Sequence, residues 1–302
     1  MMDIVQFNEH FAIPGVLVFQ ATPSGLVYAE ISTSHARATV YLQGAHLAHW
    51  QPAGQQAVLF LSRRSDFVPG KAIRGGVPIA FPWFAARHDG KTGPSHGFAR
   101  IQDWTLAFAA LADDDLHLTF TLGPTELSRS LGYGHFHLVY QLTIGRTLTM
   151  RLTVANDADT PLIFEEALHT YYSIADIHEA SVTGLEGTTY LDKMEDMRDM
   201  MQHGAVAITS PTDRVYPNTA ATCVLHDAVG RRRITVAKAG SDTTVIWNPW
   251  DSGALKLPDL EPSEWHKFIA IETVNAAANL VRLAPGATHT MQAHISVEDI
   301  EA

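Results

Sequence analysis

Hydrophobic and polar residues alternate with a period of two along much of this chain. The segments 116–122 and 148–154 place apolar side chains at every second position, and Asn156-Asp157 follows the second segment. Such alternation predicts strands with one buried face, because successive side chains of a strand point to opposite faces. The same pattern, or a short apolar run, predicts further strands at residues 38–42, 137–144, 162–173, 245–247, 268–273 and 291–296.

Turn-forming residues separate these strands, as in Pro52-Ala53-Gly54 and Pro285-Gly286-Ala287. Helical periodicity is confined to two short stretches, residues 126–131 and 273–278. Many closely spaced strands with few helices predict an all-β sandwich. No shift in composition and no linker-like tract divides residues 1–302, so we expect a single domain.

Composition narrows the classes of function. Hydrophobic residues make up 46% of the chain, enough for a large core, and 21 basic against 32 acidic residues leave a formal charge of -11. That charge argues against a nucleic-acid partner, which needs a basic surface. Cys223 is the one cysteine, so no internal disulfide can form, and a reducing compartment fits.

The beginning of the chain, MMDIVQFNEHFAIPG, has neither a basic start nor a long apolar run. Apolar stretches elsewhere stop well short of the roughly 20 residues that a membrane helix needs. We therefore expect a cytoplasmic protein with no membrane partner. No extended apolar surface pattern stands out, so we expect a monomer.

Residues 63–100 break the strand pattern with glycine, proline and aromatic residues, and long structured loops of this kind are commonly functional. Arg74 precedes Gly75-Gly76, and Arg100 follows Ser95-His96-Gly97. A guanidinium fork suits phosphate or carboxylate, and glycines allow a backbone to approach a ligand closely. The pair of arginines suggests an anion pocket. Tight turns carrying surface arginines are the alternative for each motif alone.

Two further residues could exchange protons. Within the strand 162–173, a period of two places Glu165, His169 and Tyr171 on one face, and histidine titrates near neutral pH. Glu272 follows the apolar run 268–271, where a carboxylate is costly unless it has a partner or a function. A partly exposed histidine and a strand-end glutamate turned toward water are the alternatives.

Several common chemistries lack their motifs. The sixteen histidines include no H-E-x-x-H pattern, and no paired cysteines are present, so we expect no metal. Phosphate-binding and dinucleotide-binding glycine loops are also missing, as is G-x-S-x-G. We expect no cofactor.

Taken together, the motifs resemble the glucose-6-phosphate 1-epimerase family of the galactose-mutarotase-like superfamily, over roughly residues 44–294. Each motif is weak alone, but six in the same order are specific. They are Arg74-Gly75-Gly76-Val77-Pro78 with Pro82-Trp83-Phe84, His96-Gly97-Phe98-Ala99-Arg100, Leu168-His169-Thr170-Tyr171-Tyr172, residues 184–193, Trp247-Asn248-Pro249-Trp250 and Ile271-Glu272-Thr273.

The resemblance implies a galactose-mutarotase-like antiparallel β-supersandwich with few short helices and a sugar cleft on a concave face. It implies that the protein interconverts the α and β anomers of a hexose 6-phosphate, with His169 as general acid and Glu272 as general base. The substrate-binding residues that it implies are Arg74 and Arg100 for the phosphate, Ser95 between them, His96 near the ring and Asp192 for sugar hydroxyls.

Two other functions stay open on the sequence. An aldose 1-epimerase acting on unphosphorylated sugars would share the fold, although it would not need the two arginines. A non-catalytic carbohydrate-binding module would keep the aromatic residues but would not need both His169 and Glu272. In some members of the family, glutamine stands where this chain has the shorter Ser95. The phosphate contact at this position therefore differs from theirs.

Overall fold

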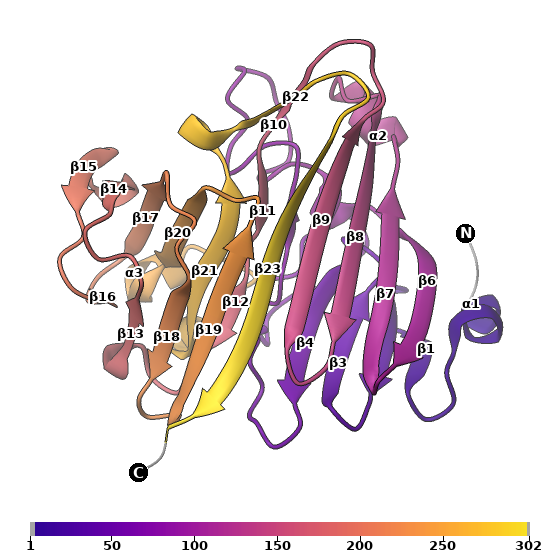
Figure 1. Cartoon of the computed structure of the whole chain (residues 1–302), viewed down its shortest axis with the longest axis horizontal. Coiled ribbons are helices and arrows are strands. Elements are labelled where there is room, and N and C mark those ends of the chain that lie inside the picture. Colours follow the sequence, from indigo (N-terminus) through magenta and orange to yellow (C-terminus); the bar gives the residue numbers. More distant parts are fainter. Residues whose placement is uncertain (1–3, 301–302) are drawn as a thin grey trace.

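The alternating segments form strands of a nine-stranded antiparallel sheet in the computed structural model, which describes residues 4–300. In β7 (Asp115–Leu122) and β9 (Leu148–Asn156) every second side chain is buried, as the pattern predicts. Figure 1 shows this sheet as the layer of long strands in front. Its order is β16 (Val206–Ala207), β13 (Ala180–Thr183), β18 (Cys223–Asp227), β19 (Arg232–Ala239), β23 (Thr288–Asp299), β9, β8 (Phe136–Ile144), β7 and β6 (Thr105–Ala112).

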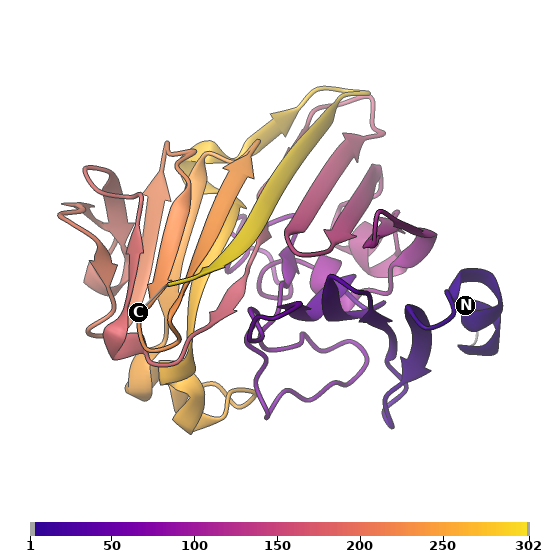
Figure 2. The same cartoon turned by 60° about the horizontal axis from the view of Figure 1, so that its bottom comes forward.

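A second layer of shorter strands lies behind it. An eight-stranded sheet follows the order β15 (Arg198–Met201), β14 (Thr189–Asp192), β17 (Thr212–Pro217), β20 (Thr243–Asn248), β21 (Phe268–Asn275), β11 (Glu166–Leu168) and β5 (Ile79–Ala80), with β12 (Tyr171–Ser173) also on β21. A four-stranded sheet contains β1 (Leu17–Ala21), β2 (Val27–Ser32), β3 (Ala36–Tyr41) and β4 (His46–Pro52), and β10 (Leu162–Phe164) pairs with β22 (Val281–Leu283). The named strands all pair antiparallel in these sheets, and Figure 2 shows the indigo N-terminal strands apart from the orange and gold ones.

Helices are few and short. The stretch predicted at 126–131 forms α2 (Glu126–Ser130), whose first turn is closed by reciprocal hydrogen bonds between Thr125 and Ser128. The stretch 273–278 was predicted wrongly, because β21 runs on through Asn275. The other helices were not predicted, and they are α1 (Ile4–Phe11), α3 (Trp250–Ala254) and the 3-10 turns η1 (Ala99–Ile101), η2 (Ile177–Glu179), η3 (Lys193–Glu195), η4 (Pro262–Lys267) and η5 (Ala277–Asn279).

No helix within residues 4–300 is long and apolar enough to cross a membrane.

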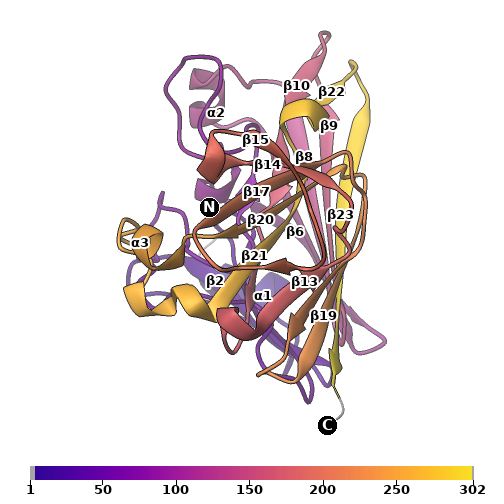
Figure 3. The same ribbon diagram turned by 90° about the vertical axis from the view of Figure 1, so that its left-hand side faces the viewer.

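In Figure 3, α3 lies beside the eight-stranded sheet, on the side away from β23. The loops before and after α3 therefore cover the outer face of the shorter-stranded layer, where the candidate site described below is found.

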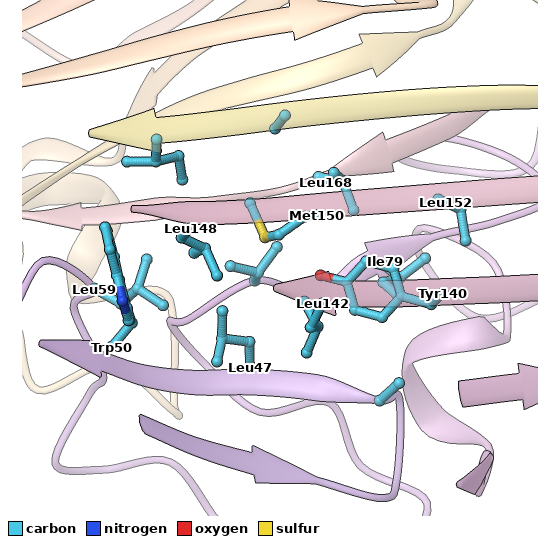
Figure 4. Close-up of a cluster of buried hydrophobic side chains, with 14 of the residues drawn as sticks. Leu47, Trp50, Leu59, Ile79, Tyr140, Leu142, Leu148, Met150, Leu152 and Leu168 are labelled. Atoms are coloured by element: carbon cyan, nitrogen blue, oxygen red, sulfur yellow. The ribbon is translucent and has the colours of Figure 1, made fainter. Parts of the chain in front are cut away.

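The main core fills the space between the two layers. Figure 4 shows Leu47 and Trp50 of β4 on one side and Leu142 and Met150 of β8 and β9 on the other, and all four are fully buried. Each such side chain contributes roughly 1.5–3 kcal/mol by leaving water. Trp50 also donates its indole N–H to the carbonyl oxygen of Gly145, at 3.1 Å, which satisfies its one polar atom inside the core.

The strand predicted at 162–173 is split into β10, β11 and β12. It breaks at Glu165, whose N–H donates to Pro82, and at His169, whose N–H donates to Pro78. Both hydrogen bonds continue the antiparallel register of β5 with β11, in which Ala167 pairs with Ala80 and Leu168 with Ile79. They anchor the loop of residues 63–100 against the eight-stranded sheet.

Candidate active site

The outer face of the eight-stranded sheet carries a few polar side chains among apolar ones. All eight residues of β21 are buried, because the core covers one face and the loops cover the other. Ile269 and Ile271 belong to the main core. Ala270 and Glu272 alternate with them and therefore point to the opposite, outer face. This explains how a carboxylate stands within an apolar strand.

His169 lies directly across from Glu272. Leu168 pairs with Thr273 and Tyr171 with Ala270, so the same register brings His169 level with Glu272. Nε2 of His169 is 3.3 Å from Oε1 of Glu272, and the two side chains are only 9% and 1% exposed. The two residues predicted to act as acid and base, about a hundred positions apart in the chain, are thus neighbours.

A cavity of about 300 Å³ opens above this pair. That volume lies at the lower end of the range for small-molecule sites. Six of the seven residues predicted for the site line it, and Asp192 does not. The lining is formed by Arg74, Phe84, Ala85, Ser95, His96, Arg100, His169, Lys193, Asp213, Trp247, Leu257 and Glu272.

Arg74 is held in place by two neighbours. Its Nη1 donates to the hydroxyl of Tyr171 at 2.9 Å, and its Nη2 lies 3.1 Å from Oδ2 of Asp259. Burial alone would lower the pKa of Arg74, but Tyr171 and Asp259 outweigh it and raise that pKa. The residue after Arg74 has to be glycine, because φ is +108° at position 75 and a Cβ atom there would overlap the carbonyl oxygen of Phe60.

Arg100 is the second cation of the cavity. Its Nη2 donates to the carbonyl oxygen of Ser95 at 2.7 Å, while its buried Nε has no partner within residues 4–300. Burial lowers the pKa of Arg100 to about 10, so the group stays positive at neutral pH. Ser95 therefore positions Arg100 through its backbone, and its side chain is exposed at the cavity edge.

His96 packs against the acid–base pair as a neutral ring. Its ring lies edge-on to His169, with centroids 5.3 Å apart. Nδ1 of His96 accepts the N–H of Ala85 at 3.3 Å, so its proton is on Nε2. Burial, and then the charges of Arg100, Lys193 and Arg74, lower the pKa of His96 to about 3.

Asp192 lies on the other face of the sheet. Leu191 pairs with Val215, which lies on the outer face, so Asp192 and its partner Arg214 point the opposite way. The Asp192 carboxylate accepts the N–H of Met194 at 2.9 Å and lies 3.7 Å from Nε of Arg214. The expectation that Asp192 holds sugar hydroxyls therefore loses its geometric basis.

Asp213 stands in the cavity instead, and the sequence analysis missed it. It pairs with Trp247 across the sheet and so shares its outer face. Its Oδ1 lies 3.1 Å from Nζ of Lys193, and burial raises its pKa against the opposing effect of that lysine. The alternation in Thr212-Asp213-Arg214-Val215 was the available signal, since it puts Asp213 on the face of Val215.

Burial acts against charge on both members of the central pair. It lowers the pKa of His169 well below its usual value, and the neighbouring His96, Arg100 and Arg74 lower it further. It raises the pKa of Glu272 well above its usual value, with a smaller contribution from Asp213. Both shifts act toward the uncharged forms, a neutral imidazole beside a protonated carboxyl, which share one exchangeable proton.

Within residues 4–300, no group of three or more histidine, cysteine, aspartate or glutamate side chains is placed to hold a metal ion. The cavity holds an imidazole in contact with a carboxyl group, a second imidazole and two guanidinium groups, set in an antiparallel β-sandwich. Fold and cavity together define the class: a β-sandwich protein with a buried imidazole–carboxyl pair in a polar cavity. The chain belongs to the aldose 1-epimerase family, whose model matches residues 29–296.

Relatives extend this assignment along most of the chain. A protein of Salmonella typhimurium named "Putative glucose-6-phosphate 1-epimerase" is 35% identical over 280 residues, covering 90% of this chain and 92% of its own length. A protein of Escherichia coli K12 with the same name is 35% identical over 243 residues, covering 80% of each chain. These similarities, with the family match, make this chain an isomerase of the epimerase type.

Solved structures agree on the fold. The crystal structure of a "putative mutarotase" from Salmonella typhimurium superposes with a TM-score of 0.89 at 32% identity, covering 96% of both chains. A galactose mutarotase-like protein from Clostridium acetobutylicum superposes with a TM-score of 0.71 at 13% identity, covering 94% of this chain and 98% of that one. The galactose-mutarotase-like sandwich expected from the sequence is confirmed.

Proposed function

We propose that this protein interconverts the α and β anomers of a hexose 6-phosphate. The observation that carries the proposal is the 3.3 Å approach of His169 to Glu272 in a cavity that Arg74 and Arg100 also line. An acid and a base in contact serve proton transfer, and two guanidinium groups serve a phosphate. The names of the relatives support the same substrate class.

The reaction needs two proton transfers and no redox step. Glu272 takes the proton of the C1 hydroxyl while His169 protonates the ring oxygen, so the C1–O5 bond breaks and an open-chain aldehyde forms. Rotation about C1–C2 exposes the other face of the carbonyl, and the reverse transfers close the ring. Positioned acid and base groups each contribute roughly 10²–10⁴-fold to such a step.

The remaining cavity residues hold the sugar. Asp213 and Lys193 offer an acceptor and a donor for hydroxyls, and the ring of Trp247 offers an apolar face. Arg74 and Arg100 bind the phosphate, with Ser95 between them and His96 close to the sugar ring. Because the phosphate is remote from C1, its binding energy positions the substrate rather than making or breaking bonds.

The decisive experiment is a panel of hexose 6-phosphates and free hexoses, scored by anomer exchange in NMR spectra. We expect exchange above the uncatalysed rate for the phosphorylated sugars and much weaker exchange for the free ones. Equal catalysis of both would instead favour an aldose 1-epimerase on unphosphorylated sugars. Binding without exchange would favour a carbohydrate-binding module.

The proposal includes where and how the protein works. A hexose 6-phosphate substrate, a single cysteine and an acidic net charge of -11 suit a cytoplasmic enzyme. We propose that it acts as a monomer, without metal or cofactor, because acid–base ring opening needs only side chains. Size-exclusion chromatography with light scattering, and activity after treatment with a chelator, test these two points.

A further inference from the structure

Two of the rings that contact His169 in the cavity, those of Tyr171 and His96, are linked to an arginine. Tyr171 stacks on His169, with centroids 4.9 Å apart and planes at 11°, and its hydroxyl accepts from Arg74. His96 lies edge-on to His169. The residue before His96 is Ser95, whose carbonyl holds Arg100. The anion end and the acid–base end of the cavity are therefore physically joined.

The charged groups around His169 are not evenly balanced. Lys193 forms an ion pair with Asp213, and Arg74 forms one with Asp259. Glu272 faces His169 itself. Arg100 forms no ion pair within the described residues, and its one hydrogen bond goes to a backbone carbonyl. The charge of Arg100 is thus the least directly paired of the positive charges around the imidazole that has to become positive.

We propose that the phosphate of the substrate moves the proton of the pair from Glu272 to His169. This inference rests on the proposed function. When the dianion binds Arg74 and Arg100, it offsets the positive charge that opposes an imidazolium. The O–H bond of Glu272 then breaks and an N–H bond forms at Nε2 of His169. No outside acid or base is needed, because the proton stays within the pair.

The burial and charges already described support this direction. Arg100 and Arg74 both contribute to lowering the pKa of His169, so cancelling their charge removes part of that effect. The carboxylate that forms at Glu272 is the base that removes the C1 proton, and the imidazolium at His169 is the acid for the ring oxygen. Phosphate binding thus sets both partners in their working form. A free hexose meets the pair in its neutral form.

The test supplies the substrate in two pieces. Anomer exchange of a free hexose is followed by NMR with increasing inorganic phosphite, at constant pH and ionic strength, after subtraction of the rate without protein. We expect saturable stimulation on the order of tenfold, the size of the interaction between charges several ångströms apart in a protein. Chloride at equal ionic strength controls for screening. Competitive inhibition, or no effect, overturns the proposal.

A matched pair of variants locates the effect. Arg100→Met removes the least directly paired cation, so stimulation by phosphite is expected to disappear. Lys91→Met removes a positive charge from an exposed lysine on the same loop, outside the cavity lining, and stimulation is expected to persist. Stimulation that survives in Arg100→Met contradicts the proposed electrostatic route.

A spectroscopic measurement separates charge transfer from mere ordering. Histidine labelled with ¹⁵N in the whole protein reports the protonation of His169, assigned by comparison with His169→Asn. Adding phosphite is expected to bring its two ring nitrogens toward the shifts of an imidazolium. Unchanged shifts in the presence of rate stimulation overturn the proposal, because phosphite would then act only by positioning groups. Catalysis of hexose 6-phosphates without any stimulation by phosphite also overturns it while leaving the proposed function intact; catalysis of neither sugar removes the function itself.

Discussion

Two imidazole–carboxylate pairs lie on opposite faces of the eight-stranded sheet, one at Glu272 of β21 and the other at Glu166 of β11. On the outer face, Nε2 of His169 is 3.3 Å from Glu272. On the core face, Nε2 of His289 is 3.0 Å from Oε1 of Glu166. Glu166 also accepts a hydrogen bond from Asn275, its cross-strand partner, at 2.9 Å.

Burial acts to lower the pKa of both histidines, but their net shifts differ because their neighbours differ. The pKa of His289 is raised, mainly by its hydrogen bond to Glu166. The pKa of His169 is lowered by burial and by the positive groups that share its cavity. The pKa of the histidine is therefore shifted in opposite directions in two pairs of the same residue types. The surrounding groups, and not the pair itself, set the direction of the shift.

Glu272→Gln is the sharpest way to separate the pairs. It removes the base of the outer pair, so we expect kcat to fall by about 10²–10⁴-fold while binding of the sugar phosphate is largely kept. The measurement is anomer-resolved NMR at saturating substrate. The matched control is Glu166→Gln, which should change kcat much less and unfold more readily. A normal rate in Glu272→Gln would remove Glu272 from the proposed role.

Removing either arginine takes away a cation that distinguishes the surroundings of the outer pair from those of the core pair. Arg74→Ala and Arg100→Ala are each expected to raise KM for a hexose 6-phosphate by about 10–100-fold, the range for charge-assisted hydrogen bonds. KM for a free hexose should change far less. Steady-state kinetics on both sugars decide the point, and equal losses on the two would refute the phosphate assignment.

Tyr171→Phe tests the link between the two ends of the outer site. The ring stays against His169, but the hydroxyl that accepts from Arg74 is lost. We expect a rise in KM for the phosphorylated sugar of about 2–10-fold, the range for one hydrogen bond, with kcat little changed. A fall in kcat with unchanged KM would place Tyr171 in proton transfer instead.

The core pair should show itself in stability as a function of pH. Since the folded-state pKa of His289 is raised, its stabilising contribution is fully present below its ordinary pKa and is lost as the pH rises through the folded value. Burial also raises the pKa of Glu166, which acts in the same direction. We expect His289→Gln to lower the free energy of unfolding by roughly 1–2 kcal/mol at pH 6 and by less at pH 9.

Urea unfolding at the two pH values measures this difference. His294→Gln, on the same strand, controls for the loss of an imidazole that instead contacts Thr149. A cost of His289→Gln that is the same at both pH values would mean that the core pair contributes through packing and not through charge.

Much of the site could be predicted from residue types in their local context. A carboxylate after an apolar run singled out Glu272, and a histidine on a polar strand face singled out His169. The two Gly-linked arginines indicated an anion pocket, and both line the cavity. Asp213 was missed and Asp192 was preferred because a period of two gives relative faces only. Which face meets a cavity depends on the neighbouring strands and on the loops that cover them.

The sequence by itself determined the all-β class, the central strands and the chemical types available for catalysis, since alternation and turn residues act over a few positions. Tertiary structure decided the rest. It split the segment 162–173 into three strands and placed the middle one, β11, between β5 and β21. It also brought His169 level with Glu272 through the register of β21 with β11 and β12. Strand pairing joins residues far apart in the chain, and no local pattern specifies that register.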